Sequence, residues 1–453
     1  MDISTLFSSH QEGGGPPTVA VETLGCKVNQ YETSYLLEAL MGAGFVRVPF
    51  RERADVYIVH SCAVTAKAGF QARQLLRRAR RANPGALVVV AGCYAQLDAD
   101  RIAREHLATH ILGNPAKFDL VSRLRLPGTF DAPCRLTDAA PRSRDFEILP
   151  VSSMHTGRTR AMLKIQDGCD AFCSYCVVPL VRGKSRSLPL RDAVAQIERL
   201  VDAGYEEIVL TGIHLGQWGR ELAPRLDLCD LLRALDSGRR PPRVRLSSLE
   251  PMEIGAELLD LASSLPWICP HLHVPLQSGD AEILERMRRP YGPSQYADLI
   301  TRIRERLPEA GIGADVLVGF PGETPRQFEN TAELIEKLPL TYLHVFPFSP
   351  RPGTPAANFP GRIEGGELKR RAKILQELGR SKKREFRQRF VGRRLEALIE
   401  KRLDSGTWEG LTANYINVIV RGGDDPRPGK RVPVTITGFI GEDLEGEVVR
   451  SEQ

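Results

Sequence analysis

The sequence has little of what membrane-spanning or secreted proteins need. Its longest apolar runs, such as ALVVVAG at 86–92, have the length of a strand, whereas a membrane-spanning helix needs about 20 apolar residues. The N-terminal stretch MDISTLFSSHQEGGGPPTVAVETLG has no basic segment followed by an apolar one, so it does not resemble a secretory signal. We therefore expect a cytoplasmic protein that uses no membrane and keeps its thiols reduced.

Disulfide bonds are not expected in a cytoplasmic protein. The chain has nine cysteines in 453 residues, and in a large cytoplasmic protein such residues are more often metal ligands, catalytic groups or core residues. With 42% apolar and 26% charged residues the composition is that of a globular protein, and the length suggests about three domains.

Positive charge is concentrated in one segment. The net charge is +6, yet residues 369–394 hold twelve Lys or Arg against two Glu. A second basic run, RQLLRRARR, covers 73–81. Such runs attract polyanions, most commonly nucleic acid, although a solvated helix face gives the same pattern.

Strands and helices alternate in the N-terminal region. The patterns predict strands over 18–25, 54–61 and 86–92 and helices over 29–44 and 70–85. This alternation is typical of a parallel α/β sheet, which we assign to a domain at 17–124. Residues 125–158 predict a linker.

Six further strand–helix units follow, and they predict an incomplete (βα)6 barrel at 159–391 that ends in the basic helix. The expected barrel strands are AMLKIQDG, EEIVLTGI, RVRLSSLE, CPHLHVPL, GADVLVGF and TYLHVFPF. Short strand patterns at RLEALIEKRL, LTANYINVIV, RVPVTITGFI and LEGEVV predict a small β-domain at 392–453. The expected fold class is therefore α/β with a C-terminal β-barrel.

Three cysteines follow the first barrel strand within eight positions. Cys169, Cys173 and Cys176 have the spacing C-x₃-C-x₂-C, which allows a loop to bind three irons of a [4Fe-4S] cluster and leave the fourth iron open. A zinc site would need a fourth ligand, for which His155 is the closest upstream candidate. Three isolated buried thiols are the remaining alternative.

Three other cysteines each lie just beyond one of the three N-terminal strands. Cys26, Cys62 and Cys93 are far apart in the chain, but the carboxyl ends of neighbouring parallel strands meet at one edge of a sheet. We expect the three thiols to converge there and to hold a second [4Fe-4S] cluster. Ordinary core cysteines are the alternative.

The stretch QDGCDAFCSYCVVP on a partial barrel resembles the radical S-adenosylmethionine enzymes. The resemblance implies that S-adenosylmethionine binds the open iron and is cleaved reductively to a radical. It also implies cofactor contacts at the carboxyl ends of the barrel strands, although turn residues give similar patterns. The candidate cofactor contacts are Tyr175, Thr211, Gly212, Glu250, Gln277 and Gly319.

Two cysteine triplets together resemble the methylthiotransferases, which insert sulfur at a C–H position and methylate it with a second S-adenosylmethionine. GLTANYINVIV at 410–420 is similar to their RNA-binding TRAM domain. TLGCKVNQYET at 23–33 is similar to the corresponding stretch in one branch of the family, which modifies threonylcarbamoyladenosine beside the tRNA anticodon. The family usually has Asn where this chain has His60, and Thr at Ala63. His60 is then either an extra iron ligand or a hydrogen-bonding neighbour.

The resemblance also implies partners: the tRNA anticodon stem-loop, a flavodoxin- or ferredoxin-type electron donor and a source of sulfur. The basic helix is expected to grip tRNA phosphates, and its candidate RNA contacts are Arg380, Lys382, Lys383, Arg384 and Arg387. Isopentenyladenosine in tRNA and a ribosomal protein side chain are alternative substrates. A zinc-stabilised RNA-binding module without catalysis is the alternative from another class.

Overall fold

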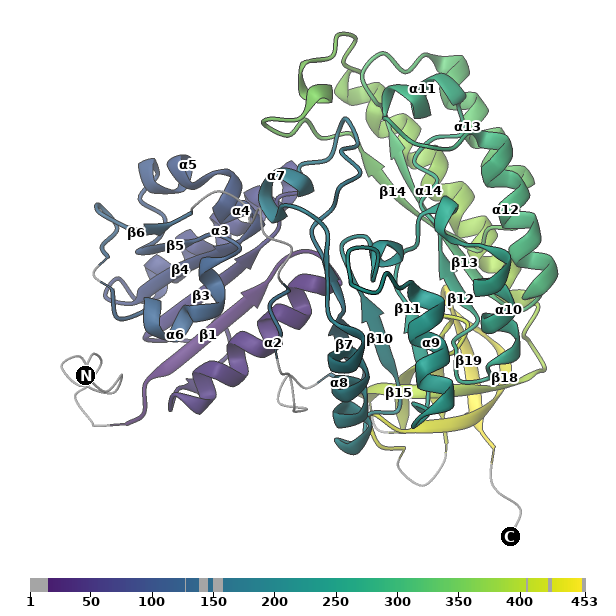
Figure 1. The fold of residues 1–453 in the computed structure, drawn as a ribbon, viewed down its shortest axis with the longest axis horizontal. Coiled ribbons are helices and arrows are strands. Elements are labelled where there is room, and N and C mark those ends of the chain that lie inside the picture. Colours follow the sequence, from purple (N-terminus) through teal and green to yellow (C-terminus); the bar gives the residue numbers. More distant parts are fainter. Residues whose placement is uncertain are drawn as a thin grey trace. The chain divides into compact units, whose positions relative to one another are not determined.

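The computed structural model describes residues 15–126, 128–137, 146–149, 158–404, 406–422 and 426–449. The chain forms two compact units (Figure 1). The first contains the N-terminal sheet together with Asp167–Arg186 and Ser349–Ala357, and the second contains Ser187–Phe348 and the C-terminal β-domain. The loop with Cys169, Cys173 and Cys176 therefore belongs to the first unit, whereas the sequence had grouped it with the barrel domain.

The first unit is built on a six-stranded parallel sheet in the order β2-β1-β3-β4-β5-β6, which confirms the predicted parallel sheet. Its strands are β1 (Thr18–Thr23), β2 (Val46–Arg47), β3 (Val56–Ser61), β4 (Leu87–Gly92), β5 (His110–Leu112) and β6 (Cys134–Leu136). Its helices are α2 (Lys27–Gly42), α3 (Ala66–Ala82), α4 (Cys93–Leu97), α5 (Ala99–Arg104), η1 (Ala116–Asp119) and α6 (Leu120–Arg123).

The sheet has an apolar cluster on each face because side chains alternate along its central strand. Tyr57 and Val59 of β3 pack with Leu76 of α3, whereas Ile58 packs with Leu36 of α2 on the other face. All six residues of β3 are buried. The strand is thereby fixed in register, and its carboxyl end is held beside those of β1 and β4.

Strand β6 lies inside the segment 125–158 that the sequence predicted to be a linker. It pairs with β5 through Cys134–Leu136, and three residues with one exposed side chain between two half-buried ones give little periodic signal. The stretches 138–145 and 150–157 of the predicted linker, including His155, lie outside the described residues.

The second unit contains the six predicted parallel barrel strands, in two three-stranded sheets ordered β11-β10-β7 and β12-β13-β14. The strands are β7 (Ala161–Lys164), β10 (Ile208–Thr211), β11 (Val244–Leu246), β12 (His271–His273), β13 (Gly311–Val318) and β14 (Tyr342–Pro347). Backbone hydrogen bonds from Val244 to Trp267 (2.7 Å) and from Cys269 to Val244 (2.8 Å) connect the sheets at β11. The predicted partial (βα)6 barrel is thus confirmed.

Helices cover the barrel strands, as expected for repeated βα units (Figure 1). They are α8 (Leu190–Asp202), α9 (Leu228–Ser237), α10 (Ala256–Ser264), α11 (Ala281–Arg286), α12 (Pro293–Arg306), α13 (Pro325–Lys337) and α14 (Gly365–Gln388). The connecting segments, of which Asp167–Arg186 and Ser349–Ala357 belong to the first unit, add β8 (Gln166–Asp167), α7 (Val178–Arg182), β9 (Arg186–Ser187), η3 (Leu215–Gln217), η4 (Pro251–Glu253) and η5 (Pro355–Asn358). Over the described residues, no helix is both long and apolar enough to cross a membrane.

The C-terminal domain is a closed five-stranded barrel, as the sequence predicted for its class. Its strands are β15 (Arg394–Asp404), β16 (Thr407–Thr412), β17 (Asn417–Arg421), β18 (Arg431–Ile440) and β19 (Asp443–Val448). The single strand predicted over 411–420 is wrong, because a turn separates β16 from β17. Tyr415 in this turn has a φ of +69°, a left-handed conformation that a strand cannot contain.

A buried ion cluster connects this small barrel to the βα barrel. The Glu207 carboxylate accepts hydrogen bonds from Arg243 and Arg245, each at 2.7 Å, and all three side chains are almost fully buried. The two guanidinium groups continue to the carbonyls of Leu411 (3.3 Å) and Ala413 (2.9 Å). The two barrels therefore share one set of buried charges.

Glu207→Gln should destabilise the second unit by about 3–5 kcal/mol, because it leaves two buried cations without their carboxylate. Burial raises the pKa of Glu207, but Arg245 and Arg243 outweigh it and lower the pKa to about 2. A depressed pKa stabilises the fold fully above the unfolded value of about 4.3. The difference in unfolding free energy between the two proteins should therefore shrink as the pH falls from about 4.3 towards 2. Urea titrations across this range measure it, and a constant difference would contradict the assignment.

Candidate active site

The first unit brings Cys26, Cys62 and Cys93 to the carboxyl edge of its sheet. Cys26 precedes α2 directly after β1, Cys62 follows β3, and Cys93 begins α4 directly after β4. The pairing of Ser61 with Gly92 sets the two following cysteines side by side. At Gly25, which has a φ of +115°, an added Cβ would lie 2.7 Å from the Cβ of Cys62. This close approach places the Cys26 loop over Cys62.

All three of these residues are free cysteines, two of them buried. Burial and the neighbouring Cys93 thiol raise the pKa of Cys62 to about 12. The thiol therefore stays protonated at neutral pH until a metal displaces the proton. Two of the sulfur atoms accept hydrogen bonds: Cys62 from the Val64 amide and Cys93 from the Asn114 side chain, both at 3.5 Å. A set of three thiols with supporting donors fits an iron–sulfur cluster that has one open iron.

The second triplet lies in the loop between β8 and α7. Gly168 begins the loop with a φ of +72°, and an added Cβ would lie 2.0 Å from the carbonyl oxygen of Lys184, so only glycine fits. The Cys169 amide donates to the carbonyl of Gly183 (3.0 Å), and the Cys176 amide to that of Cys173 (3.0 Å). These bonds close the base of the loop. Its three thiols give the donor set that a [4Fe-4S] cluster with one open iron requires.

A buried arginine connects the two cysteine regions within the first unit. Arg182, at the end of α7, donates to Glu32 (3.0 Å) and Asn29 (2.7 Å) of α2 and to Asp167 (2.9 Å), just before the cysteine loop. Lys117 donates to the same Glu32 at 2.7 Å. The four charged side chains are at most 3% exposed. Because each buried charge has a partner, the network holds α2 and the cysteine loop in one arrangement.

Asn114 connects the same two regions by a second route. Its side-chain amide donates to the Val181 carbonyl in α7 (2.8 Å) and to the sulfur of Cys93 (3.5 Å), while its oxygen accepts from Lys117 (2.7 Å). Glu32, Asn114, Lys117 and Arg182 were not among the residues predicted from the sequence. The available signals were the position of Glu32 inside TLGCKVNQYET, together with Cys26, and that of Arg182 six residues after Cys176.

His60 lies against α2, on the same side as Glu32. Its Nδ1 is 2.8 Å from the Thr33 hydroxyl and its Nε2 is 3.5 Å from Glu32. Burial and the nearby Lys117 cation lower the pKa of His60 to about 3, so the ring is neutral at physiological pH. These contacts suit a neighbour that supports the thiol site through α2.

The predicted cofactor residues of the second unit lie at or just beyond the ends of barrel strands. Thr211 is buried at the end of β10. An added Cβ at Gly212 would lie 2.9 Å from the Gln166 side chain, and at Gly319 (φ +75°) 2.2 Å from Leu368. Gly212 is therefore tightly packed, whereas at Gly319 the left-handed backbone is what favours glycine.

The other three predicted cofactor contacts have different local environments. Gln277 has a φ of +63°, and its backbone amide donates a hydrogen bond to the Asp315 carbonyl at 2.8 Å. Glu250 forms an ion pair with Arg289. Tyr175 is half-buried in the cysteine loop of the first unit. As cofactor contacts, all six residues stay predictions.

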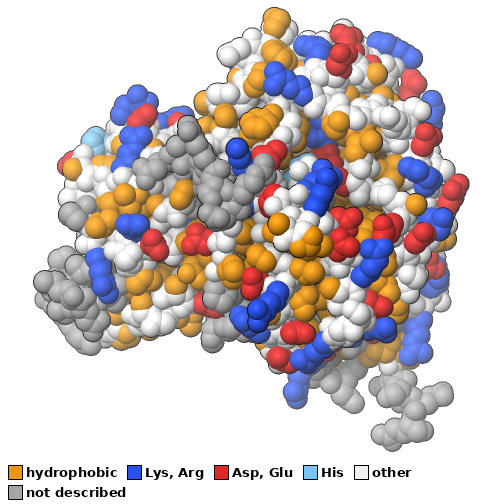
Figure 2. Space-filling model, in the orientation of Figure 1, with side chains coloured by type: hydrophobic (Ala, Val, Ile, Leu, Met, Phe, Trp, Pro, Cys, Tyr) orange, Lys and Arg blue, Asp and Glu red, His pale blue; other side chains and the backbone are white. Residues whose placement is uncertain are grey.

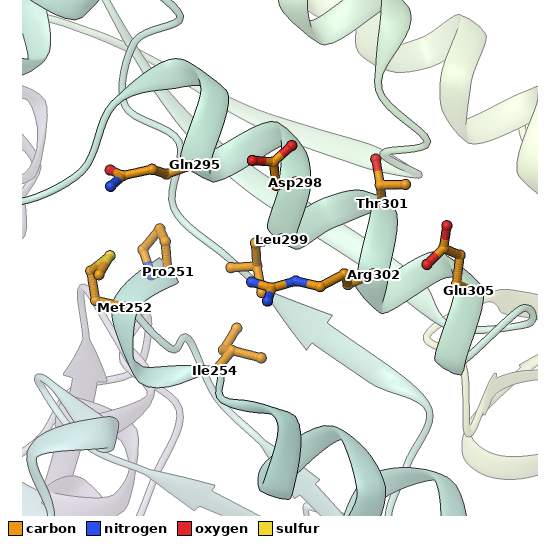
Figure 3. Close-up of a pocket in the computed structure, with 9 residues that line it drawn as sticks. All are labelled: Pro251, Met252, Ile254, Gln295, Asp298, Leu299, Thr301, Arg302 and Glu305. Carbon is orange, nitrogen blue, oxygen red and sulfur yellow. The ribbon is translucent and has the colours of Figure 1, made fainter.

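A cavity of about 520 Å³ lies beside Glu250, between η4 and helix α12 (Figure 3). Pro251 and Met252 line one side and Asp298 and Arg302 of α12 the other. None of the six predicted cofactor residues lines this cavity, and we assign it no role in the site.

The predicted RNA contacts on α14 fall into two groups. Arg380 and Arg384 are exposed. Lys382 is partly buried and donates to the carbonyls of Glu336 and Leu338, and Lys383 lies near Glu442.

Arg387 is the clear exception to the prediction, because its side chain is only 3% exposed and pairs with Asp443 at 2.9 Å. It connects α14 to the small barrel and is not available to a phosphate. On the face in Figure 2, Lys and Arg side chains are interspersed with Asp and Glu.

Comparisons with known proteins match all three parts of the chain. Residues 18–113 match the uncharacterized protein family UPF0004, 163–335 the radical SAM superfamily and 388–449 the TRAM domain. The chain is 36% identical to the threonylcarbamoyladenosine tRNA methylthiotransferase MtaB of Bacillus subtilis, over 96% of each protein. It is 31% identical to a tRNA-2-methylthio-N(6)-dimethylallyladenosine synthase of Chromobacterium violaceum, over 96% of this chain and 99% of that protein.

Among solved structures, the chain resembles the radical S-adenosylmethionine methyltransferase TsrM of Kitasatospora setae, with a TM-score of 0.53 and 18% identity over 76% of this chain and 77% of that one. At this identity the likeness concerns the fold alone. The radical SAM match carries with it the use of S-adenosylmethionine and of one [4Fe-4S] cluster.

Proposed function

The chain belongs to the radical S-adenosylmethionine methylthiotransferase family, and we propose that it transfers a methylthio group to C2 of threonylcarbamoyladenosine beside the tRNA anticodon. The observation that carries this proposal is the 36% identity to MtaB over 96% of both proteins. The lower identity to a dimethylallyladenosine synthase, 31%, makes the isopentenyl-type substrate the weaker candidate.

We assign the two metal sites by their positions in the chain. Cys169, Cys173 and Cys176 hold the cluster that meets S-adenosylmethionine, and Cys26, Cys62 and Cys93 hold a second one. When bound, the two clusters supply the electron that cleaves S-adenosylmethionine and the sulfur that is transferred. The six candidate cofactor contacts, including Thr211 and Gln277, would orient that molecule at the strand ends.

The protein itself positions the thiols and balances their charge. Arg182 lowers the cost of ionising Cys26 and Cys62, since its cation acts to lower the pKa of both thiols and so opposes the effect of burial at Cys62. Asn114 donates to the sulfur of Cys93 while it holds α7. His60 stays neutral and adds no charge. The target base must leave its stack to present C2 to such a site.

The tRNA anticodon stem-loop is the proposed partner, bound by α14 and the TRAM domain. Arg380→Ala combined with Arg384→Ala should weaken tRNA binding roughly tenfold. It should also lower the slope of the logarithm of the binding constant against the logarithm of the salt concentration by about two, because two phosphate contacts are lost. Binding isotherms at several salt concentrations measure both quantities. Arg326→Ala, on an exposed position of α13, is the control. An unchanged salt slope in the double variant would contradict a role for this helix face.

Turnover also needs an electron donor, of the flavodoxin or ferredoxin type, and a source of replacement sulfur. Because the substrate is tRNA, we place the reaction in the cytoplasm.

Nucleoside analysis of tRNA tests the proposed substrate. In cells that lack the gene, 2-methylthio-threonylcarbamoyladenosine should disappear while its unmethylthiolated precursor accumulates, and the wild-type gene should restore it. Loss of the methylthio form of isopentenyladenosine instead would identify the other tRNA substrate. If all methylthio nucleosides of tRNA persist, the tRNA proposal is wrong and a ribosomal protein becomes the substrate to test.

A further inference from the structure

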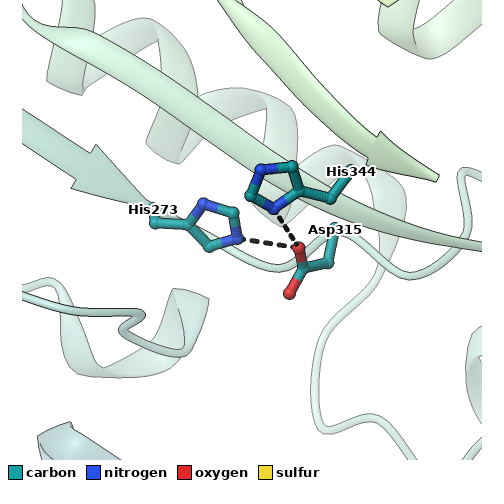
Figure 4. Close-up of side chains that lie close together, drawn as sticks. All are labelled: His273, Asp315 and His344. Atoms are coloured by element: carbon teal, nitrogen blue, oxygen red, sulfur yellow. Dashed lines mark hydrogen bonds and ion pairs between the residues drawn. The ribbon is translucent and has the colours of Figure 1, made fainter. Parts of the chain in front are cut away.

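Three strands of the βα barrel direct metal-binding side chains to one point, in the second unit. His273 from β12, Asp315 from β13 and His344 from β14 converge there (Figure 4). The Oδ1 atom of Asp315 lies 2.9 Å from Nε2 of His273 and 3.2 Å from Nδ1 of His344. The three potential ligand atoms all lie within 4.8 Å of one another.

We propose that these three residues hold a divalent transition-metal ion, of which Zn²⁺ is the simplest case. Two imidazole nitrogens and one carboxylate oxygen are a common ligand set for such ions, at about 2.0–2.2 Å from the metal. Ligands at these distances stand about 3 Å apart on the same ion, close to the two separations from the Asp315 oxygen. The site contains no sulfur, so it is chemically distinct from both cysteine triplets.

A hydrogen bond outside the triad supports the arrangement. A histidine that binds a metal through one nitrogen usually donates a proton from the other to a nearby oxygen. The Nδ1 atom of His273 lies 3.1 Å from the Tyr342 hydroxyl, which in turn lies 2.8 Å from Nε2 of His271. These hydrogen bonds fix the orientation of the His273 ring, with its Nε2 atom directed at the proposed ion.

The exposure of the three side chains leaves one side of the site open. His273 is 6% exposed, Asp315 25% and His344 50%. His344 also lines a cavity of about 300 Å³ together with Tyr342, Tyr415 and Lys383. An ion held by three protein ligands next to a cavity keeps a position for water or another ligand.

The same three side chains can also satisfy one another without a metal, because His273 and His344 can each hydrogen-bond the Asp315 carboxylate. The alternative is a row of hydrogen bonds with no ion, and metal analysis separates the two.

The experiment uses the full chain purified anaerobically with its iron–sulfur clusters loaded, so that the cysteines are occupied. The protein is equilibrated by dialysis at micromolar free Zn²⁺, and bound zinc and iron are measured by mass spectrometry. Wild type should bind about one zinc per chain. Asp315→Asn and His344→Ala should each weaken zinc binding at least about tenfold at unchanged iron content. His106→Ala, which removes an exposed histidine of the first unit, should have no effect.

X-ray absorption at the zinc edge provides the second readout. Nitrogen and oxygen ligands without sulfur are expected. Zinc bound equally by wild type and Asp315→Asn, zinc with sulfur ligands, or no zinc bound by wild type would each overturn the proposal. Since His344 is half exposed, its alanine variant should fold, and Asp315→Asn preserves the shape of the side chain.

Discussion

Cys173→Ser should abolish both the cleavage of S-adenosylmethionine and the formation of methylthio product, whereas Cys62→Ser should abolish only the product. The first substitution removes one of the three proposed ligands of the cluster that binds S-adenosylmethionine. The second affects the other triplet, whose three cysteines follow β1, β3 and β4. Each loss should be at least about 1,000-fold, the scale seen when an enzyme loses an indispensable group.

Chromatography of 5′-deoxyadenosine measures the cleavage, and mass spectrometry of digested tRNA measures the product. Cys134→Ser is the matched control, since Cys134 lies in β6 and belongs to neither triplet; both activities should persist. The iron content of Cys173→Ser and of Cys62→Ser should each fall to the share of one cluster, whereas Cys134→Ser should keep the iron of both. If Cys62→Ser retains product formation, or loses cleavage along with it, the division of roles between the triplets is wrong.

Arg182→Met should destabilise the first unit by about 3–5 kcal/mol, because it leaves Glu32 and Asp167 buried with fewer cationic partners. Arg182 hydrogen-bonds both carboxylates, and its side chain is 1% exposed. Denaturant titration of the cluster-free protein measures this without any contribution from activity. Arg78→Ala, on the exposed face of α3, should change the unfolding free energy by less than about 0.5 kcal/mol.

A double variant checks that the effect comes from the charge network. Glu32→Gln with Arg182→Met should cost less than the sum of the two single changes, since each removes the partner that the other leaves unpaired. Additive costs would indicate that Arg182 stabilises the unit through packing alone.

The parts of the site that could be predicted from the sequence are those that follow from regular structure. A parallel sheet necessarily brings the ends of β1, β3 and β4 together, so the convergence of Cys26, Cys62 and Cys93 followed from their positions after three strands. The loop of Cys169, Cys173 and Cys176 was visible because its residues are close in sequence. Both inferences used a local pattern and a geometric rule.

The parts that were missed depend on contacts between distant segments. Arg182 meets Glu32 across 150 positions, and a charged residue in a basic stretch gives no sign that it will be fully buried. Arg387 is the converse case: it resembled a phosphate contact in a basic helix but is buried against Asp443. The broken strand at Tyr415 and the short β6 were missed because few residues carry the signal.

Reconstituted turnover tests the central claim most directly. The anaerobic protein, with both clusters loaded, receives S-adenosylmethionine, a chemical reductant and tRNA that carries either threonylcarbamoyladenosine or isopentenyladenosine, and mass spectrometry of the nucleosides follows. We predict that the 2-methylthio form of threonylcarbamoyladenosine accumulates and that isopentenyladenosine stays unchanged. Methylthiolation of isopentenyladenosine alone, or cleavage of S-adenosylmethionine with no methylthio product on either tRNA, would contradict the account.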